Sequence, residues 1–494
     1  MRPGQRTALR DAALGVAIAL GQAPLGLWPV ALAGLALALW RMASAPTPGA
    51  AFRRGWLIGA GHFAFALSWI VQPFFVDPWR HGWMAPFAIL GIAFGLGLFW
   101  GAAGWLARRL GGGAVTVALA WSGAELARGL VLTGFPWALP GHIWTETPLV
   151  QTAALIGANG LTAATLLALA APLAWGRRGL AVPALVLAVA GGWSWHRLSL
   201  PEPAAPGGVV RLVQPDIAQS LKWDPDEARA NFDILLALSA DAPADLIVWP
   251  ETAVPFLLNE GQGAALAMAA VAGGTPLAAG IQRVEGDLGW NSLAVIGPGG
   301  SITPVFDKIH LVPFGEYVPF GDWAYETFGL RAFAAQTGAA YAAGTTRNAV
   351  ALSPRTGLAL PVICYEAIFP EELIAAPRAD WLLQITNDAW FGTLTGPYQH
   401  LAQARLRAVE LGLPLVRVAN TGVSLVTDAR GRTVTDLHGA PALLPLGARG
   451  TLDVSLPGPL PATPYARIGD WPLALLLLAG LVLAGLVRLR RDGA

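Results

Sequence analysis

Long apolar runs fill most of the first two hundred residues and return near the C-terminal end. A helix needs roughly 20 apolar residues to cross a bilayer core about 30 Å thick. Seven runs approach that length, near residues 12–40, 56–76, 84–107, 111–127, 149–175, 179–196 and 471–487. Acidic side chains are scarce among them, since residues 1–200 contain only Asp11, Asp77, Glu125 and Glu146 beside thirteen arginines. The pattern predicts a polytopic α-helical membrane bundle.

The composition excludes several other classes of protein. Charged residues make up 13% of the 494, against about a quarter in a soluble protein. A hydrophobic content of 54% excludes disorder, and a single cysteine excludes a disulfide scaffold. Nucleic-acid binding is not expected, because the net charge is +1 and no basic cluster lies on a globular segment. Residues 201–470, in contrast, have the mixed polarity of a globular domain.

Arginine clusters beside the apolar runs predict the topology. They are Arg2/Arg6/Arg10, Arg41/Arg53/Arg54, Arg108/Arg109, Arg177/Arg178 and Arg488/Arg490/Arg491. If 12–40 folds as a hairpin of two short helices, all five clusters lie on one side, which is then cytoplasmic. If 12–40 is one tilted helix, the first cluster lies opposite the others. The charges favour the hairpin, about eight spans and both termini in the cytoplasm. The first run resembles a signal peptide, but its length favours an uncleaved anchor.

This topology divides the chain into three parts. Residues 1–197 form a transmembrane region with seven spans, and 471–494 form a C-terminal span with a basic cytoplasmic tail. Residues 198–470 form an external domain, which is periplasmic in a Gram-negative inner membrane. Within the first part, Glu125 is either functional, because a carboxylate is costly in lipid, or an interfacial partner of Arg128.

The external segment predicts an α/β domain, because short apolar strands alternate there with helical stretches. The expected strands lie at 209–214, 245–249, 276–282, 292–297, 303–307, 358–363, 381–386 and 415–419. Helical stretches are expected at 225–240, 262–272 and 398–412.

Three reactive residues stand directly after three of these strands: Glu251, Lys308 and Cys364. Ligands of α/β sheets gather beyond the carboxyl ends of the strands, so one cleft could hold all three. A free thiol is only slightly ionised at neutral pH. A carboxylate can accept the thiol proton, and an ammonium favours both the thiolate and the oxyanion that follows its attack.

Each of these residues alone also fits a structural role. A lone cysteine is often inert and buried, and a strand-end glutamate is often merely exposed. Lys308 is more informative, because the chain holds thirty arginines and only two lysines, Lys222 and Lys308. An ammonium kept at this position indicates a role that a guanidinium cannot fill.

The segments around these residues resemble the Glu-Lys-Cys motifs of the nitrilase superfamily, and most of all those of its membrane-bound apolipoprotein N-acyltransferases. They are Trp249-Pro250-Glu251, Asp307-Lys308 with His310 to Pro319, and Ile363-Cys364-Tyr365-Glu366. Further matching segments are Thr386 to Gly392, Gly396-Pro397-Tyr398-Gln399-His400 and Arg405 to Glu410. An eight-span frame around one external α/β domain also fits this family.

The resemblance implies a four-layer αββα sandwich that transfers a fatty acyl chain from a phospholipid, typically phosphatidylethanolamine. The implied acceptor is the α-amino group of the diacylglyceryl-cysteine that begins a bacterial apolipoprotein. In a ping-pong reaction, Cys364 would form the thioester and Glu251 would act as the base. Lys308, with a backbone N–H after Cys364, would hold the oxyanion.

Further roles follow from the same resemblance. Glu316 corresponds to a second glutamate that supports the triad, and Tyr365 and Glu366 correspond to conserved neighbours of the nucleophile. A labile thioester requires a pocket that excludes water, and candidate lining residues are Trp223, Trp390, Phe391, Phe314 and Tyr317. Asn291 is a candidate for positioning substrate.

No cofactor, metal or obligate oligomer is expected. The seven histidines, His310 and His400 among them, are scattered without metal-site spacing. The expected partners are membrane lipids, the phospholipid donor and the diacylated apolipoprotein, with the protein acting as a monomer.

Two alternatives remain at this point. A membrane-tethered nitrilase-type amidase or hydrolase would share the first half-reaction and use water in the second. A transporter or receptor would use the external domain for binding only, and would keep its function without the Cys364 thiol.

Overall fold

The computed structural model describes residues 3–222, 225–319, 321, 332 and 340–492. Its contacts divide the chain into two compact units. The helical unit comprises Met1–Leu200, Leu394–Leu411 and Ala462–Ala494, and the sandwich unit comprises Pro201–Thr393 and Gly412–Pro461. Each unit is described separately.

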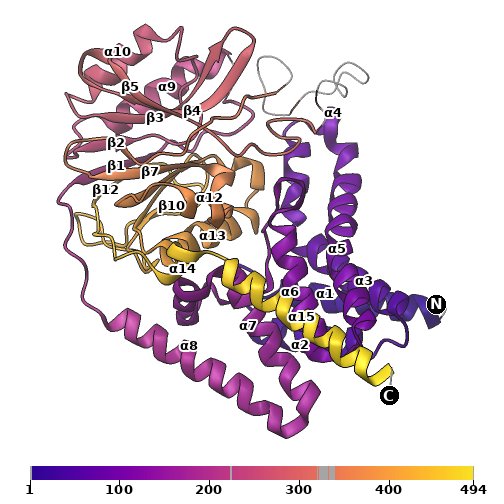
Figure 1. Cartoon of the computed structure of the whole chain (residues 1–494). Coiled ribbons are helices and arrows are strands. Elements are labelled where there is room, and N and C mark those ends of the chain that lie inside the picture. The colour runs from indigo at the N-terminus through magenta and orange to yellow at the C-terminus, as the bar shows by residue number, and fades with distance from the viewer. Residues whose placement is uncertain (1–2, 223–224, 320, 322–331, 333–339, 493–494) are drawn as a thin grey trace. The chain divides into compact units, whose positions relative to one another are not determined.

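The helical unit consists of helices of 4 to 25 residues, some of them joined by short 3₁₀ segments (Figure 1). They are α1 (Pro3–Ala19), α2 (Trp28–Ala43), α3 (Pro48–Ala66), α4 (Pro78–His81), α5 (Ala85–Arg109), α6 (Ala114–Arg128), α7 (Ala153–Trp175), α8 (Ala181–Ser199), α13 (Gly396–Leu411), α14 (Pro464–Ile468) and α15 (Trp471–Asp492). Helix α13, which the sequence places among the strands of the α/β domain, packs with α7 and α14 in this unit.

Within the described residues, three helical segments are long and apolar enough to cross a membrane: Pro78–Arg109, Pro148–Ser199 and Trp471–Arg491. A fourth is present if the bent pair Pro48–Ala66 and Ser68–Phe75 forms one span. These lengths do not confirm the expected count of about eight. The 12–40 run is divided between α1 and α2, which pack together, and the turn between them contains Gly26 at φ +60°.

Helices α3 and α5 pack closely because glycines line their contact. A Cβ atom added to Gly55 would lie 2.3 Å from the Trp100 carbonyl oxygen, and one added to Gly59 would lie 2.8 Å from the Gly97 Cα. Small residues allow helix backbones to approach in this way, which is a common packing mode of membrane helices. Gly55, Gly59 and Gly97 therefore serve packing between the two helices.

The sandwich unit contains two six-stranded sheets, stacked face to face in Figure 1. The first has the order β12-β1-β2-β3-β4-β5 and the second β11-β10-β9-β8-β7-β6. Their bounds are β1 Val209–Gln214, β2 Leu246–Val248, β3 Leu277–Glu285, β4 Leu288–Ile296, β5 Ile302–Asp307, β6 Val350–Ala351, β7 Leu358–Ile363, β8 Trp381–Thr386, β9 Leu415–Ala419, β10 Ser424–Thr427, β11 Leu443–Leu444 and β12 Gly450–Ser455. The eight expected strands all have counterparts, so the α/β prediction is confirmed.

The central strands of both sheets are parallel. Strands β1, β2 and β3 run in register with Val210 beside Leu246 and Val248 beside Ala278. Strands β7, β8 and β9 do the same, with Ile363 beside Ile385 and Thr386 beside Ala419. Parallel central strands align their carboxyl ends, so residues that follow these strands gather at one edge of each sheet.

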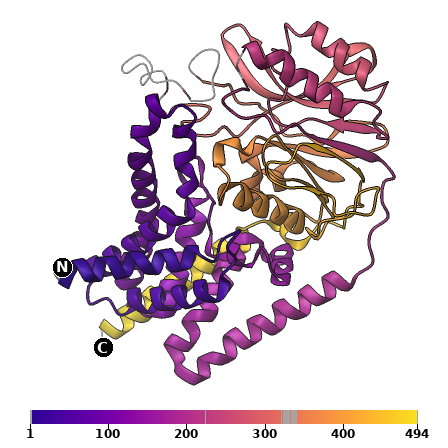
Figure 2. The ribbon, with the colours of Figure 1, turned by 180° about the vertical axis from the view of Figure 1, so that it is seen from behind.

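Helices α9 (Pro225–Ser239) and α10 (Gln262–Val271) cover the first sheet, and Figure 2 shows them from behind. Their apolar side chains, including Phe232, Leu235 and Met268, form one buried cluster with Ile247 and Leu277 of the sheet. Burial of this apolar surface supports the strands that carry the candidate site.

Candidate active site

Glu251 lies in the turn that follows β2, and its carboxylate is buried, with 7% of the side chain exposed. Its Oε1 accepts a hydrogen bond of 2.7 Å from Asn291 Nδ2. Its Oε2 accepts one of 2.9 Å from the backbone N–H of Asn387. Two fixed donors therefore orient a carboxylate that can accept a proton.

Lys308 follows β5 and is 1% exposed. Its Nζ lies 2.9 Å from Glu316 Oε1 and 3.5 Å from Glu251 Oε1. Burial by itself lowers the pKa of Lys308, but the Glu316 and Glu251 carboxylates outweigh burial and hold the pKa above its ordinary value. Lys308 therefore stays an ammonium between the two carboxylates.

Cys364 follows β7 and begins a 3₁₀ turn (Cys364–Ile368). Its φ of +53° lies in the left-handed region, which is uncommon for a residue with a side chain and costs backbone strain. Burial and the Glu251 charge raise the pKa of the thiol, whereas the Lys308 ammonium opposes that rise. The resting group is therefore a thiol, which needs a base before it can attack.

Glu366 joins the turn that begins at Cys364 to the segment after Lys308. Its Oε2 accepts a hydrogen bond of 2.6 Å from Ile363 N–H, next to Cys364. Its Oε1 accepts bonds of 2.8 Å from Ile309 N–H and 2.8 Å from Arg347 Nη2. A fully buried carboxylate thus holds the strand ends that carry the thiol and the ammonium in fixed positions.

The other supporting candidates lie beside these groups. Asn291 donates to Glu316 Oε1 at 3.1 Å as well as to Glu251, so the structure places it between the two carboxylates. The second Glu316 oxygen accepts the Val312 N–H at 2.9 Å. The Tyr365 ring packs edge-on against His310, with centroids 5.6 Å apart.

The candidate lining residues are less uniform. Phe391 is buried, Trp390 and Tyr317 are half-buried, and Phe314 is 61% exposed. Trp223 lies outside the described residues.

Lys222 carries no predicted role in the sequence, but the structure places it beside Glu251. Lys222 is buried, and its Nζ donates hydrogen bonds to the Glu251 carbonyl oxygen at 3.0 Å and to Thr252 Oγ1 at 2.6 Å. Thr252 has a φ of +46°, which a β-branched residue rarely adopts. Both lysines of this chain therefore lie at the candidate site, and the scarcity of lysine was the signal that could have found Lys222.

A buried polar network next to Cys364 is likewise not predicted from the sequence. Arg417 pairs with Asp388, and both side chains are fully buried. Arg417 Nη1 also donates to Gln384 Oε1, and Gln384 Nε2 donates to the Cys364 carbonyl oxygen at 3.0 Å. These residues lie on or near β8 and β9, where the sequence shows only apolar strands with single polar interruptions.

Within the helical unit, Glu125 forms the buried ion pair with Arg128 that the sequence left as one of two alternatives. Arg128 Nη1 also donates to the Trp137 carbonyl oxygen at 3.0 Å. The pair thus joins the end of α6 to the loop that follows, which is a structural role.

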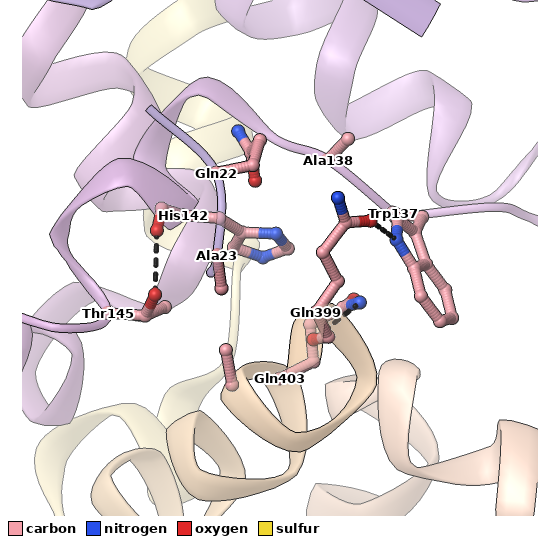
Figure 3. Close-up of a pocket in the computed structure, with 9 residues that line it drawn as sticks. Gln22, Ala23, Trp137, Ala138, His142, Thr145, Gln399 and Gln403 are labelled. Carbon is pink, nitrogen blue, oxygen red and sulfur yellow. Dashed lines mark hydrogen bonds between the residues drawn. The ribbon is translucent and has the colours of Figure 1, made fainter. Parts of the chain in front are cut away.

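A small polar cavity lies in the same unit (Figure 3). Gln22, His142, Gln399 and Gln403 contribute polar side chains, and Trp137 Nε1 donates to Gln399 Oε1 at 2.7 Å. Its size suits about one water molecule held by polar partners. None of the Glu-Lys-Cys residues lines it.

The α/β fold belongs to the carbon-nitrogen hydrolase class. Residues 209–442 match the family model described as carbon-nitrogen hydrolase. Residues 14–171 match a second model, described as the apolipoprotein N-acyltransferase N-terminal domain. The two matches together cover most of the sandwich unit and most of the helices before it.

Curated relatives carry both parts in one chain. An apolipoprotein N-acyltransferase of Caulobacter vibrioides is 40% identical over 95% of this chain and 93% of its own. An apolipoprotein N-acyltransferase of Bradyrhizobium diazoefficiens is 40% identical over 97% of this chain and 95% of its own. This chain belongs to the apolipoprotein N-acyltransferase family.

Among solved structures, a CN-hydrolase superfamily protein of Xanthomonas campestris aligns with a TM-score of 0.36 and 20% identity. The alignment covers 55% of this chain and 96% of that one.

Proposed function

We propose that this chain transfers a fatty acyl group from a phospholipid to the α-amino group of the N-terminal diacylglyceryl-cysteine of apolipoproteins, through a thioester on Cys364. Full-length relatives with that family name support the overall activity. The observation that carries the chemistry is the buried Glu251–Lys308 pair, 3.5 Å apart, whose charges act in opposite directions on the Cys364 thiol.

In the first half-reaction, Glu251 accepts the thiol proton as the Cys364 sulfur attacks the ester carbonyl carbon. The Lys308 ammonium and the backbone N–H after Cys364 stabilise the oxyanion. When the intermediate collapses, the ester C–O bond breaks and Glu251 returns the proton to the leaving alcohol. The products are the thioester and a lysophospholipid.

In the second half-reaction, the acceptor amine attacks the thioester carbonyl carbon. Glu251 accepts a proton from the attacking nitrogen, the C–S bond breaks, and the thiol is regenerated. Glu316 holds Lys308 in place, and Asn291 holds Glu251 in place. Glu366 and Tyr365 support the turn at Cys364. Trp390 helps to exclude water from the thioester, and Trp223, the other candidate for this role, lies outside the described residues.

The proposal includes the location of the protein. It places about eight spans in a bacterial inner membrane, with both termini cytoplasmic and a periplasmic αββα domain between the seventh and eighth spans. Phosphatidylethanolamine is the proposed donor, and the monomer is the proposed active form. The apolar helices and the five arginine clusters support this arrangement.

Intact-protein mass spectrometry of the detergent-purified protein tests the function. After incubation with phosphatidylethanolamine and no acceptor, we expect a gain of one acyl mass that hydroxylamine removes. Since Cys364 is the only cysteine, this adduct has one plausible position. Addition of a diacylated lipopeptide should discharge the adduct and yield a triacylated peptide. Discharge by water alone would instead indicate a membrane-tethered hydrolase.

Three variants test the assignments. Cys364→Ala, Glu251→Ala and Lys308→Ala should each abolish acylation in protein that stays folded and membrane-inserted, as size-exclusion chromatography and membrane fractionation would check. Near-normal turnover of Lys308→Ala would refute the oxyanion role of Lys308. Full function of Cys364→Ala would favour a transporter or receptor.

A further inference from the structure

A side chain on the neighbouring strand β8 forms a hydrogen bond to the peptide bond between Cys364 and Tyr365. Gln384 lies on β8, beside the β7 strand that leads to the nucleophile, and its Nε2 donates 3.0 Å to the Cys364 carbonyl oxygen. In a trans peptide the C=O and the following N–H point in opposite directions. Anchoring this carbonyl therefore fixes the direction of the Tyr365 N–H.

The orientation of the Gln384 amide is itself fixed. Arg417 has only donors, and its Nη1 contacts Gln384 Oε1. The amide oxygen therefore faces Arg417, which leaves the NH₂ group facing the carbonyl of Cys364. Arg417 is held in turn by the buried Asp388 carboxylate and by the Val423 carbonyl oxygen at 3.2 Å.

This network is costly to bury. Gln384, Asp388 and Arg417 are each 1% exposed or less, and replacing a whole buried charged network with apolar residues is often neutral or stabilising. Stability alone gives little reason for a glutamine in the middle of β8. A specific reason is that the glutamine orients the peptide bond beside Cys364, whose φ is +53°.

We propose that Gln384, oriented by Arg417 and Asp388, is a positioning residue that directs the Tyr365 N–H toward the acyl oxygen during thioester formation. This inference rests on the proposed function, because it requires an acyl oxyanion. Gln384 acts through the Cys364 carbonyl and does not itself touch substrate.

Two substitutions test the role. Gln384→Met removes both amide groups at similar length, whereas Gln384→Glu keeps an acceptor for Arg417 and lacks the NH₂ donor. Loss of an oxyanion donor lowers rates by about 10²–10³. A Tyr365 N–H that points partly away from the oxyanion should therefore slow thioester formation by at least about tenfold in both variants. The KM for phospholipid should stay unchanged, because the oxyanion exists only beyond the ground state.

Alkylation of Cys364 by iodoacetamide separates this role from a general effect on the thiol. Alkylation produces no oxyanion, so in both variants the rate of thioester formation should fall by more than the rate of alkylation. Equal losses of alkylation and thioester formation would overturn the proposal, as would normal thioester formation. If the unmodified protein forms no thioester, the proposed function fails, and this inference fails with it.

Gln214→Met is the matched control. Gln214 is also fully buried on a strand, and its Nε2 donates to the carbonyl oxygens of Pro445 and Ala448 at 2.9 and 2.8 Å. Gln214→Met should lower the thermal midpoint about as much as Gln384→Met does, while leaving the rate of thioester formation unchanged. If Gln384→Met does not fold, Gln384→Glu alone decides, because its carboxylate still pairs with Arg417.

Discussion

The two lysines of this chain lie in opposite electrostatic settings, although both are buried. Two carboxylates hold the pKa of Lys308 above its ordinary value. Lys222 donates hydrogen bonds to two neutral oxygens, and burial lowers its pKa from 10.5 to about 8, with the charges of Glu251 and Cys364 opposing the fall. Lys308 is therefore a permanent cation, whereas Lys222 titrates within an accessible pH range.

We expect thioester formation to have an alkaline limb near pH 8. Below that pH, the protonated Lys222 supports the Glu251–Thr252 turn and adds positive charge near the Cys364 thiolate. Above it, the charge is lost and the rate should fall, since a neighbouring cation favours the thiolate. Single-turnover acylation with phosphatidylethanolamine between pH 6 and roughly pH 10 measures this profile.

Two variants test whether Lys222 causes the alkaline limb. Lys222→Arg keeps its charge throughout this range, so the fall near pH 8 should disappear or move to higher pH. Lys222→Met should be slow at every pH and show no limb of its own. A limb that stays near pH 8 in Lys222→Arg would belong to another group.

Among the elements, α3 and α5 depend on close backbone approach. The Cβ positions of Gly55 and Gly59 on α3 are occupied by atoms of α5, whereas a Cβ on Gly91 of α5 would have no heavy atom within 4 Å. Identical substitutions at these glycines should therefore have opposite effects.

Gly55→Ala should lower the thermal midpoint in detergent, because overpacking of a tight contact costs about 1–3 kcal/mol. Gly91→Ala adds the same methyl group to open space and should be neutral or slightly stabilising, since alanine is the better helix former. Thermal unfolding monitored by circular dichroism compares the two. Equal effects would show that α3 and α5 do not approach as closely as described.

At the level of the whole molecule, the number of spans depends on the 12–40 run. The structure divides the run between α1, a helix of 17 residues that begins before the run at Pro3, and α2, a helix of 16 residues that ends beyond it at Ala43. At 1.5 Å per residue, each is about 25 Å long and slightly short of a bilayer core. Helix length therefore does not decide between one span and a hairpin, whereas the arginine distribution favours a hairpin.

Single cysteines on a Cys364→Ala background test the topology. Gly4→Cys and Gly111→Cys should be protected from a membrane-impermeant maleimide in intact cells, whereas Gly207→Cys should react after outer-membrane permeabilisation. All three sites are exposed, and a permeant maleimide should label each one. Labelling of Gly4→Cys from outside, with Gly111→Cys protected, would mean that 12–40 is one span and that the chain has seven.

Local patterns in the sequence were enough to predict several features. Apolar runs of membrane length, strands of about six residues and reactive residues at three strand ends all depend on nearest-neighbour chemistry, which the linear sequence contains. Glu251, Lys308 and Cys364 could be selected in this way because each directly follows an apolar strand. Lys222 was within reach of the same reasoning through its rarity.

The remaining features depend on pairings between distant segments. The contacts of Gln384 with Arg417 and of Glu366 with Arg347 follow from strand order and register, which local patterns do not specify. The packing of α13 with α7 likewise follows from long-range contacts. Burial then sets the protonation of Lys222 and Cys364. Residue type and spacing thus selected the chemistry, while the folded chain decided the geometry and charge states, because hydrogen bonds and desolvation arise only when distant residues meet.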